Sequence, residues 1–254
     1  MVYRTRRQSE IMRLVQLRGA CSIGDLAERL EVSDETIRRT IKPLVSEGLL
    51  SKVHGGITLP DSGREPPFQK RMLDNAEAKR RIAEHVAGRV QNGDTLILDC
   101  GSTTAFVARA LSQHTGLTVV TNSAEIARTL ATNSSNRVFM AGGELRSDDT
   151  AALGPEALKF VRQFRVQHAI LSIGAMQLDG ALMVYHLAEA EFSRAVIDQA
   201  EQVMVAADAS KFGRPSLVRI CGPERVDVLV TDSDPPADLA GAFELAGARI
   251  EVAR

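Results

Sequence analysis

A short polar run in the middle of the chain has the composition of an anion-binding loop. It consists of Asp99, Cys100, Gly101, Ser102, Thr103 and Thr104, and it ends an apolar run that begins at Thr95. Glycine lets the backbone approach a ligand closely, and the hydroxyl residues stand where a helix is expected to begin, with its free N–H groups. The chain has neither GxGxxG nor a P-loop lysine here, which argues against dinucleotides and nucleoside triphosphates. We therefore expect a phosphate-binding loop and no cofactor.

Polar residues follow three further strand-like runs in the same way. Asn122 follows the second run, Gly142 and Gly143 follow the third, and Lys211 follows the run that ends at Asp208. Each loop alone is also typical of a turn or a helix cap. In open α/β sheets, however, ligands bind beyond the carboxyl ends of the strands, so the four loops are expected to form one site.

The elements that would position this site alternate along the chain. Apolar runs of strand length are separated by amphipathic segments rich in Ala, Leu and Arg. The runs are 95–100, 117–121, 137–141, 168–173, 202–208 and 226–232. This alternation predicts an α/β domain with a largely parallel sheet that is covered on both faces.

A second group of chemically suggestive residues lies between 33 and 42. Ser33 is expected to cap a helix whose buried stripe contains Ile37, Ile41 and Leu44. The opposite face of this helix carries Thr36, Arg38, Arg39, Thr40 and Lys42. Arginine bonds guanine in the major groove through two N–H groups, and threonine contacts the thymine methyl group. The alternative is a basic helix face that only meets water.

The neighbouring segments favour the DNA-binding interpretation. Two amphipathic helices are predicted around 11–15 and 23–30, with Ser22 as the cap of the second and a turn at Glu31 and Val32 before the third. Strand-like runs at 49–53 and 57–59 form a predicted hairpin, which brings Lys52 and His54 near the phosphate backbone. Together these elements predict a winged helix-turn-helix.

Charge and composition agree with two domains of different character. The chain has 254 residues and a net charge of −1. Residues 1–60 carry ten Lys and Arg against seven Asp and Glu, a net charge of +3, so the remainder carries −4. A basic head on an acidic body suggests that the head meets a polyanion. Residues 61–75, with Gly63, Pro66 and Pro67, are predicted to be a linker between a DNA-binding domain at 3–60 and an α/β domain at 76–254.

Several function classes are disfavoured. The N-terminus is charged where a signal peptide is apolar, and no run is long enough to span a bilayer, so we expect a cytoplasmic protein without membrane contact. The three cysteines, Cys21, Cys100 and Cys221, lack zinc-ligand and redox spacing, so we expect packed thiols and no metal.

Two motif sets resemble the DeoR type of bacterial transcriptional regulators. VSDETIRR at 32–39 and HGG at 54–56 look like its DNA-binding domain, and DCGSTT at 99–104 and ADASKFGR at 207–214 look like its effector domain. AGGELRS at 141–147, SKFGRPS at 210–216 and TDSDPP at 231–236 look closest to the glycerol-3-phosphate regulon repressor subgroup. The resemblance implies an effector domain related in fold to ribose-5-phosphate isomerase.

The resemblance also implies partners and sites. It implies a repressor of a carbohydrate or polyol catabolic operon, which binds double-stranded operator DNA and a phosphorylated sugar or polyol such as glycerol 3-phosphate. We assign DNA contact to Ser33, Thr36, Arg38, Arg39, Lys42, Lys52 and His54. We assign effector binding to Asp99, Gly101, Ser102, Thr103, Thr104, Asn122, Gly142, Gly143 and Lys211. Because one small head reads few base pairs, a homo-oligomer on repeated half-sites is expected.

Two other functions remain open at this stage. The first is a sugar-phosphate isomerase with a DNA-binding head, for which the acid–base candidates are Asp179, His186, Glu189 and Asp208. The head has no purpose in a simple enzyme, so this hypothesis ranks lower. The second is a purely structural oligomerisation module, which would leave DNA binding without metabolite control.

Overall fold

The structure is a computed structural model that describes residues 5–18, 20–47, 49–53, 55–58, 65–132 and 135–254. Contacts within the chain divide it into two units, Met1–Arg64 and Glu65–Arg254, and each is described by itself. Within the described ranges, no helix combines the length and the apolar character needed to cross a membrane.

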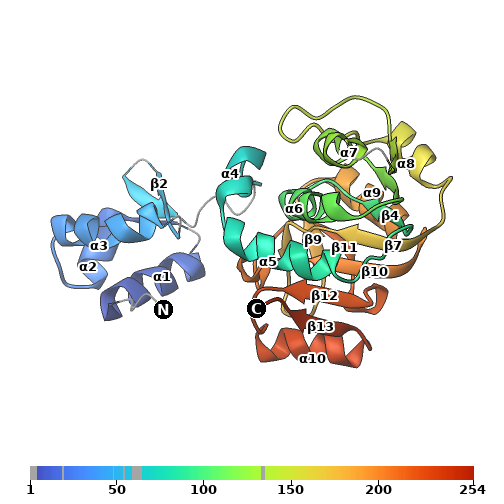
Figure 1. Ribbon diagram of the computed structural model, residues 1–254. Coiled ribbons are helices and arrows are strands. Elements are labelled where there is room, and N and C mark those ends of the chain that lie inside the picture. Colours follow the sequence, from blue (N-terminus) through green and yellow to red (C-terminus); the bar gives the residue numbers. More distant parts are fainter. Residues whose placement is uncertain (1–4, 19, 48, 54, 59–64, 133–134) are drawn as a thin grey trace. The chain divides into compact units, whose positions relative to one another are not determined.

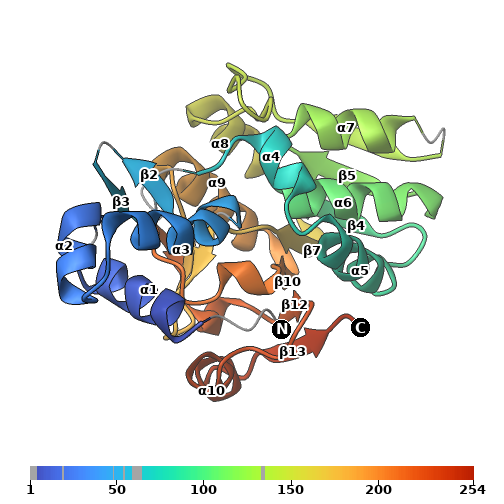
Figure 2. The same ribbon diagram turned by 90° about the vertical axis from the view of Figure 1, so that its left-hand side faces the viewer.

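The first unit is a small three-helix domain with a short antiparallel sheet (Figure 2). Its helices are α1 (Arg6–Arg18), α2 (Ile23–Arg29) and α3 (Asp34–Ser46). Its strands are β1 (Ala20–Ser22), β2 (Ser51–Val53) and β3 (Gly56–Thr58), in the order β1-β3-β2. The predicted helices and the hairpin are confirmed. Strand β1 went unpredicted, because three residues are too few to show an alternating pattern.

Apolar side chains from all three helices and the hairpin form the core of this unit. Ile11, Leu26, Ile37 and Ile57 are fully buried. Ser22 and Ser33 cap α2 and α3, with each hydroxyl accepting a bond from the N–H three residues later. Glu31 lies between the helices with a φ of 51°, in the left-handed region that lets the chain reverse over a short turn. The helix-turn-helix is thus fixed by local caps and one shared core.

The second unit contains a seven-stranded sheet (Figure 1). Its strands are β4 (Thr95–Leu98), β5 (Thr118–Thr121), β6 (Arg137–Met140), β7 (Val166–Leu171), β10 (Ala200–Ala206), β12 (Val228–Thr231) and β13 (Arg249–Val252). The order is β13-β12-β10-β7-β4-β5-β6, and every neighbouring pair is parallel. Each of the six predicted runs overlaps one strand, so the α/β prediction is confirmed.

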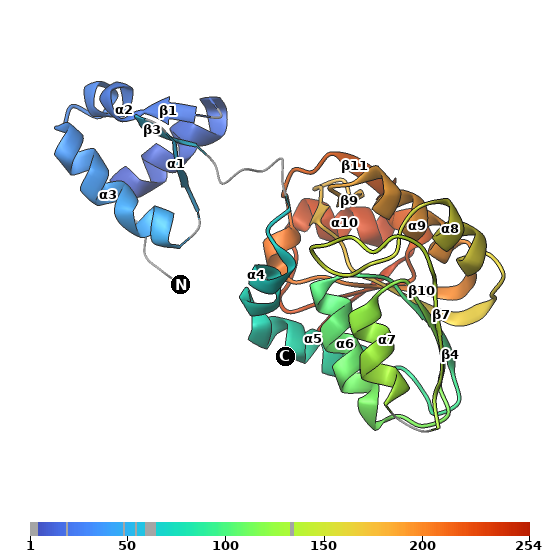
Figure 3. The same ribbon diagram turned by 90° about the horizontal axis from the view of Figure 1, so that it is seen from above.

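Helices cover both faces of this sheet (Figure 3). Leu96 and Leu98 pack on one side, against α5 (Ala76–Ala87), α6 (Ser102–Ala110) and α7 (Ala124–Ala131). Ile97 packs on the other side, against the cluster built by α8 (Pro155–Val161), α9 (Leu187–Ile197) and α10 (Ala237–Leu245). Strand side chains alternate between the faces, so a strand with two covered faces is apolar throughout, as the sequence showed.

Several short elements of the second unit went unpredicted. A small antiparallel sheet in the order β11-β9-β8 is formed by β8 (Ala175–Met176), β9 (Leu182–Val184) and β11 (Val218–Cys221). The edge strand β13 alternates charged and apolar residues and is only half-buried, so it lacked the continuous apolar run used to find strands. Short 3₁₀ turns at Leu111–Gln113, Ala209–Lys211 and Pro223–Arg225 complete the unit.

The predicted linker at 61–75 needs correction at its C-terminal end. Residues 65–75 belong to the second unit, and α4 (Phe68–Leu73) lies beside α6. Phe68 is only 8% exposed, which gives this short helix an anchor that its mixed composition concealed. Residues 61–64 lie outside the described residues.

Candidate DNA interface and effector pocket

The predicted DNA-contacting residues of α3 share one surface. Arg38, Arg39 and Lys42 are exposed, and no ion pair holds them among the residues that the structure describes. Thr36 is half-buried, and its hydroxyl is 2.9 Å from that of Ser33. The helix therefore presents free cationic side chains next to a capped N-terminus, as base and phosphate contacts require.

The wing is described in part. Lys52 on β2 is exposed, whereas His54 lies outside the described residues. β2 pairs antiparallel with β3, so Lys52 is held on a hairpin that directly follows α3 in the sequence.

A cation that the sequence analysis overlooked lies beside the recognition helix. A shallow groove is lined by Thr5, Arg7 and Gln8 from the start of α1 and by Arg39, Thr40 and Pro43 of α3. Arg7 is exposed, so it adds a second arginine to the groove that contains Arg39. It was overlooked because the helical pattern placed α1 in the core without showing which of its residues face α3.

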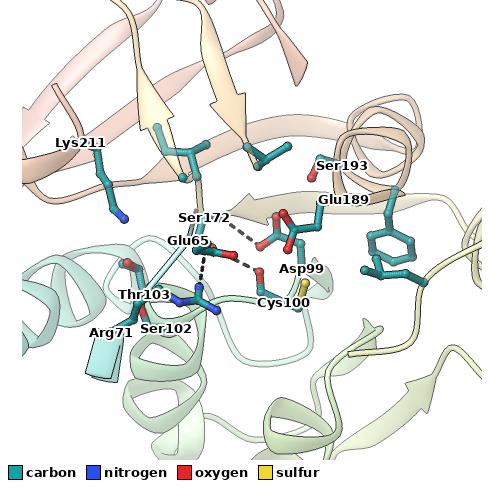
Figure 4. Close-up of a pocket in the computed structure, with 15 residues that line it drawn as sticks. Glu65, Arg71, Asp99, Cys100, Ser102, Thr103, Ser172, Glu189, Ser193 and Lys211 are labelled. Atoms are coloured by element: carbon teal, nitrogen blue, oxygen red, sulfur yellow. Dashed lines mark hydrogen bonds and ion pairs between the residues drawn. The ribbon is translucent and has the colours of Figure 1, made fainter. Parts of the chain in front are cut away.

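The second unit contains a pocket beyond the carboxyl ends of β4 and β7 (Figure 4). Its lining residues include Glu65, Arg71, Asp99, Cys100, Ser102, Thr103, Ser172, Gly174, Glu189, Ser193 and Lys211. Ser102 and Thr103 begin α6, where no side chain caps the first turn. Free N–H groups and hydroxyls thus meet at one end of the pocket, the arrangement that binds phosphate at helix N-termini.

Hydrogen bonds between the two strand ends fix the loop at 99–101. The carboxylate of Asp99 accepts a 2.9 Å bond from the N–H of Ser172, and the Ser172 hydroxyl donates to the carbonyl of Cys100. A Cβ atom at Gly101 would overlap the Ser172 side chain, so only glycine fits between the strands. Burial raises the pKa of Asp99 well above its usual range, and the charge of Glu189 adds to the rise, although Ser172 and Ser193 bond to the carboxylate.

An arginine neutralises the acidic side of the pocket. Arg146 forms ion pairs with Asp149 and, at 2.5 Å, with Glu189. Burial by itself raises the pKa of Asp149, but the hydrogen bond and charge of Arg146 outweigh it and hold that pKa low. Ligand atoms of Cys100, Asp149 and Glu189 lie within 4.8 Å of one another, a spacing compatible with a metal ion. Both carboxylates are already paired with Arg146, so this cluster gives no support for a metal.

Lys211 supplies a cation from the other side of the pocket. It follows β10, as predicted, in a short 3₁₀ turn that Asp208 caps. Burial lowers the pKa of its ammonium group to about 8, against the raising effect of Asp208. Lys211 therefore exchanges its proton near neutral pH, where an anionic ligand would favour the charged form.

The structure brings four of the nine predicted effector residues to the pocket wall, namely Asp99, Ser102, Thr103 and Lys211. Gly101 lies directly behind them. Thr104 is fully buried, and its hydroxyl donates to the carbonyl of Gly101, so it supports the loop without reaching the pocket.

Three predicted residues do not line the pocket. Asn122 is fully buried, and its amide donates to the carbonyl of Ala152, so it fastens a neighbouring loop. Gly142 and Gly143 are exposed beyond the edge strand β6 and do not belong to the pocket wall. The rule that ligands bind beyond the carboxyl ends of strands, here called the strand-end rule, correctly predicts that these glycines follow a strand. It does not say whether that strand is central or at the edge of the sheet.

Sequence reasoning also overlooked several lining residues. Ser172 and Gly174 follow β7, which ends at Leu171. The predicted run extended to residue 173, so a search beyond its end would have found Gly174 but not Ser172. Glu65 and Arg71 were hidden in the predicted linker. Of the four proposed acid–base residues, only Glu189 lines the pocket; Asp179 and His186 are exposed, and Asp208 bonds to Asn75.

Comparison with known proteins finds a match for each of the two units. Residues 7–63 match the model of the DeoR-like helix-turn-helix domain, and residues 74–233 match that of the DeoR C terminal sensor domain. The chain is 39% identical to the glycerol-3-phosphate regulon repressor of Escherichia coli, over 92% of this chain and 93% of that protein. It is 34% identical to the transcriptional repressor AccR of Agrobacterium fabrum, over 89% of each.

Solved structures support the fold alone. The tetrameric eIF2B-beta2-delta2 complex from C. thermophilum matches with a TM-score of 0.50 and 16% identity, over 95% of this chain and 71% of that one. Ribose 5-phosphate isomerase A from Neisseria gonorrhoeae matches more loosely, with a TM-score of 0.39 and 19% identity, over 55% of this chain and 54% of that one. Since both family models match and the related proteins are named as repressors, this chain belongs to the DeoR family of DNA-binding transcriptional regulators and is not an enzyme.

Proposed function

We propose that this regulator represses a carbohydrate or polyol catabolic operon in the cytoplasm, and that a phosphorylated sugar or polyol binds the pocket of the second unit and lowers its affinity for operator DNA. Glycerol 3-phosphate is the first candidate, because a related repressor is named for its regulon. The observation that carries the proposal is the convergence of the uncapped α6 N-terminus, the Ser102 and Thr103 hydroxyls and the Lys211 ammonium group on one pocket.

The chemistry of the pocket fits a phosphate ester with free hydroxyl groups. Backbone N–H groups, hydroxyls and an ammonium group are the donors that phosphate oxygens accept. Asp99 and Glu189 line the same pocket and offer carboxylate oxygens to the hydroxyls of a sugar or polyol. Both kinds of group within one site favour an ester over inorganic phosphate.

The DNA-binding role assigns the exposed cations of the first unit to the operator. Arg38, Arg39 and Lys42 on α3 would enter the major groove, and Lys52 on the wing would contact a phosphate. DNA contact by His54 remains part of the proposal. A homo-oligomer that binds repeated half-sites remains part of the proposal, because a single small domain reads few base pairs.

Thermal unfolding in the presence of paired ligands tests effector binding. The panel consists of glycerol 3-phosphate with glycerol and ribose 5-phosphate with ribose. A ligand at 100 times its dissociation constant adds about 2.7 kcal/mol, which raises Tm by roughly 5 to 10 °C for a domain of this size. We expect a rise with one ester and none with its parent, and Lys211→Met should abolish it. Lys159→Met, at an exposed position of α8, is the matched control.

A second measurement separates regulation from a purely structural second unit. The wild-type protein first selects its operator from random DNA, and operator binding is then measured with and without the stabilising ester. The ester should weaken operator binding by roughly 5- to 150-fold, the range of ordinary allosteric coupling. If every ester leaves operator binding unchanged, the oligomerisation hypothesis is preferred.

A further inference from the structure

The segment that leads out of the second unit enters the pocket described above. Glu65 is the first residue of this unit, and the chain continues from it through two prolines into α4. In the other direction the chain runs through residues 59–64 to the DNA-binding unit. Glu65 and Arg71 of this segment, here named the strap (residues 65–73), both line the pocket (Figure 4).

A buried ion pair holds the strap in place. The Glu65 carboxylate lies 2.7 Å from the Arg71 guanidinium group, and their side chains are 13% and 9% exposed. Arg71 also pairs with Asp148 at 3.3 Å, and Asp148 accepts the N–H of Phe68 at the start of α4. Arg71 and α4 are thus also held by Asp148. Glu65, in contrast, forms one ion pair within the described part of the chain, and its partner is Arg71.

Glu65 lies among the charges expected to bind an anion. Burial raises the pKa of its carboxyl group, and so does Glu189, while the positive charges of Arg71, Arg146 and Lys211 lower it. Glu65 is thus a carboxylate within electrostatic reach of the three cations around the pocket. Among the described lining residues, Glu65 and Arg71 are also the two that belong to the strap and not to the sheet, the helices on it or their loops.

The pocket has almost no free space while the strap is in place. Its cavity volume is about 20 Å³. This is room for one water molecule, whereas ligand pockets typically enclose roughly 300 to 1,000 Å³. A phosphate ester therefore enters only if a lining side chain leaves.

We propose that Glu65 is the pocket's own anionic occupant, and that the phosphate of the effector takes its place beside Arg71 and Lys211. Residues 65–67 of the strap are then expelled from the pocket, while the bonds to Asp148 keep Arg71 and α4 in place. This inference rests on the proposed effector function and adds its regulation. A phosphate group carries a charge of about −1.5 to −2 and three acceptor oxygens, so it competes well with a single carboxylate for the same cations. Because Glu65 directly follows the chain that joins the two units, its expulsion changes how that chain is anchored, which gives ligand binding a route to the DNA-binding unit.

Removing the charge of Glu65 tests the competition. Titration calorimetry on the full chain uses glycerol 3-phosphate, ribose 5-phosphate and inorganic phosphate as probes. In Glu65→Gln the bound probe should have a Kd at least about fivefold lower than in wild type, since the competing anion is gone. Glu77→Gln, at an exposed carboxylate of α5, should leave the Kd unchanged. If the Kd of Glu65→Gln equals or exceeds that of wild type, the displacement is overturned. The proposed function still stands in that case, because wild type binds the probe. Binding of no probe by wild type overturns both.

Hydrogen exchange on the wild-type protein gives a second test that needs no variant. The amide group of Arg71 donates to the carbonyl of Pro67, and that of Asp74 donates to the carbonyl of Lys70 within α4. Addition of the bound probe should speed exchange at Arg71, because residues 65–67 are released, and leave exchange at Asp74 unchanged. Slower or unchanged exchange at Arg71 with the probe bound overturns the displacement, since residues 65–67 would then close over the ligand or stay in place.

Discussion

The two units of this regulator place their working side chains in opposite environments. In the first unit the core is wholly apolar, with Ile37 fully buried, and the cations Arg38 and Arg39 face solvent. In the second unit the polar groups lie inside, with Asp99 and Thr103 each only 3% exposed. A DNA duplex is too large to be enclosed, so it is met by an outer surface, whereas a small effector is surrounded by its pocket.

This difference has electrostatic consequences. The exposed cations of α3 act through charge and geometry, and salt screens them. In the second unit, burial alters the groups themselves, since it raises the pKa of Asp99 and lowers that of Lys211 to about 8. The first unit should therefore respond mainly to ionic strength, and the second mainly to pH. The following predictions test this contrast.

The largest effect is expected from a substitution that leaves a cavity in the core of one unit only. Ile37 and Ile97 are both fully buried, one in each unit. Replacing either with alanine should cost about 2 to 5 kcal/mol in the unit that carries it, through lost burial and an unfilled cavity. By calorimetry, Ile37→Ala should lower the Tm of the small unit and abolish operator binding while glycerol 3-phosphate still binds. Ile97→Ala should lower only the transition of the larger unit. A joint shift of both transitions would contradict separate cores.

A smaller effect is expected at the recognition surface. Arg39 is exposed on α3 and lines the groove shared with Arg7. Arg39→Ala should weaken binding to a selected operator by about 1 to 3 kcal/mol, and weaken binding to random DNA less, if the side chain reads a base. Fluorescence anisotropy at fixed salt measures both affinities, with Arg162→Ala of the second unit as the control. Equal losses on both DNAs would reduce Arg39 to a phosphate contact.

The pocket should show the complementary dependence on pH. The Lys211 ammonium group attracts phosphate, and its pKa of about 8 means that it loses its proton as the pH rises. Affinity for a phosphate ester should therefore fall by roughly tenfold between pH 7 and pH 9, with proton uptake on binding. Lys211→Arg keeps its charge throughout this range and should bind with little pH dependence. Calorimetry in two buffers of different ionisation enthalpy detects the proton. If the affinity of wild type does not change with pH, or if the affinity of Lys211→Arg falls as steeply as that of wild type, this role for Lys211 is excluded.

The same contrast explains which residues the sequence revealed. The caps at Ser22 and Ser33 and the cations of α3 form one continuous pattern, so local rules found them. The loop at 99–104 and Lys211 followed from the strand-end rule. Arg71 and Glu65 enter the pocket through tertiary contacts that no local period encodes. Gly142 and Gly143 follow an edge strand and lie outside the pocket wall, and this could not be foreseen because strand order is not written in the sequence.

The smallest effect is expected on the wing, where one charge meets one phosphate. Lys52 is exposed on β2, and each neutralised phosphate contributes about 0.9 to the slope of log K against log salt concentration. Lys52→Ala should reduce that slope by about one unit, equally on operator and random DNA, because a phosphate contact carries no sequence information. Binding titrations at four salt concentrations measure the slope, with Lys159→Ala of α8 as the matched control. An unchanged slope would remove Lys52 from the interface and leave α3 as the source of the salt dependence. A loss confined to the operator would instead make the wing a reader of sequence, and the exposed surface of the first unit would then recognise bases through two elements.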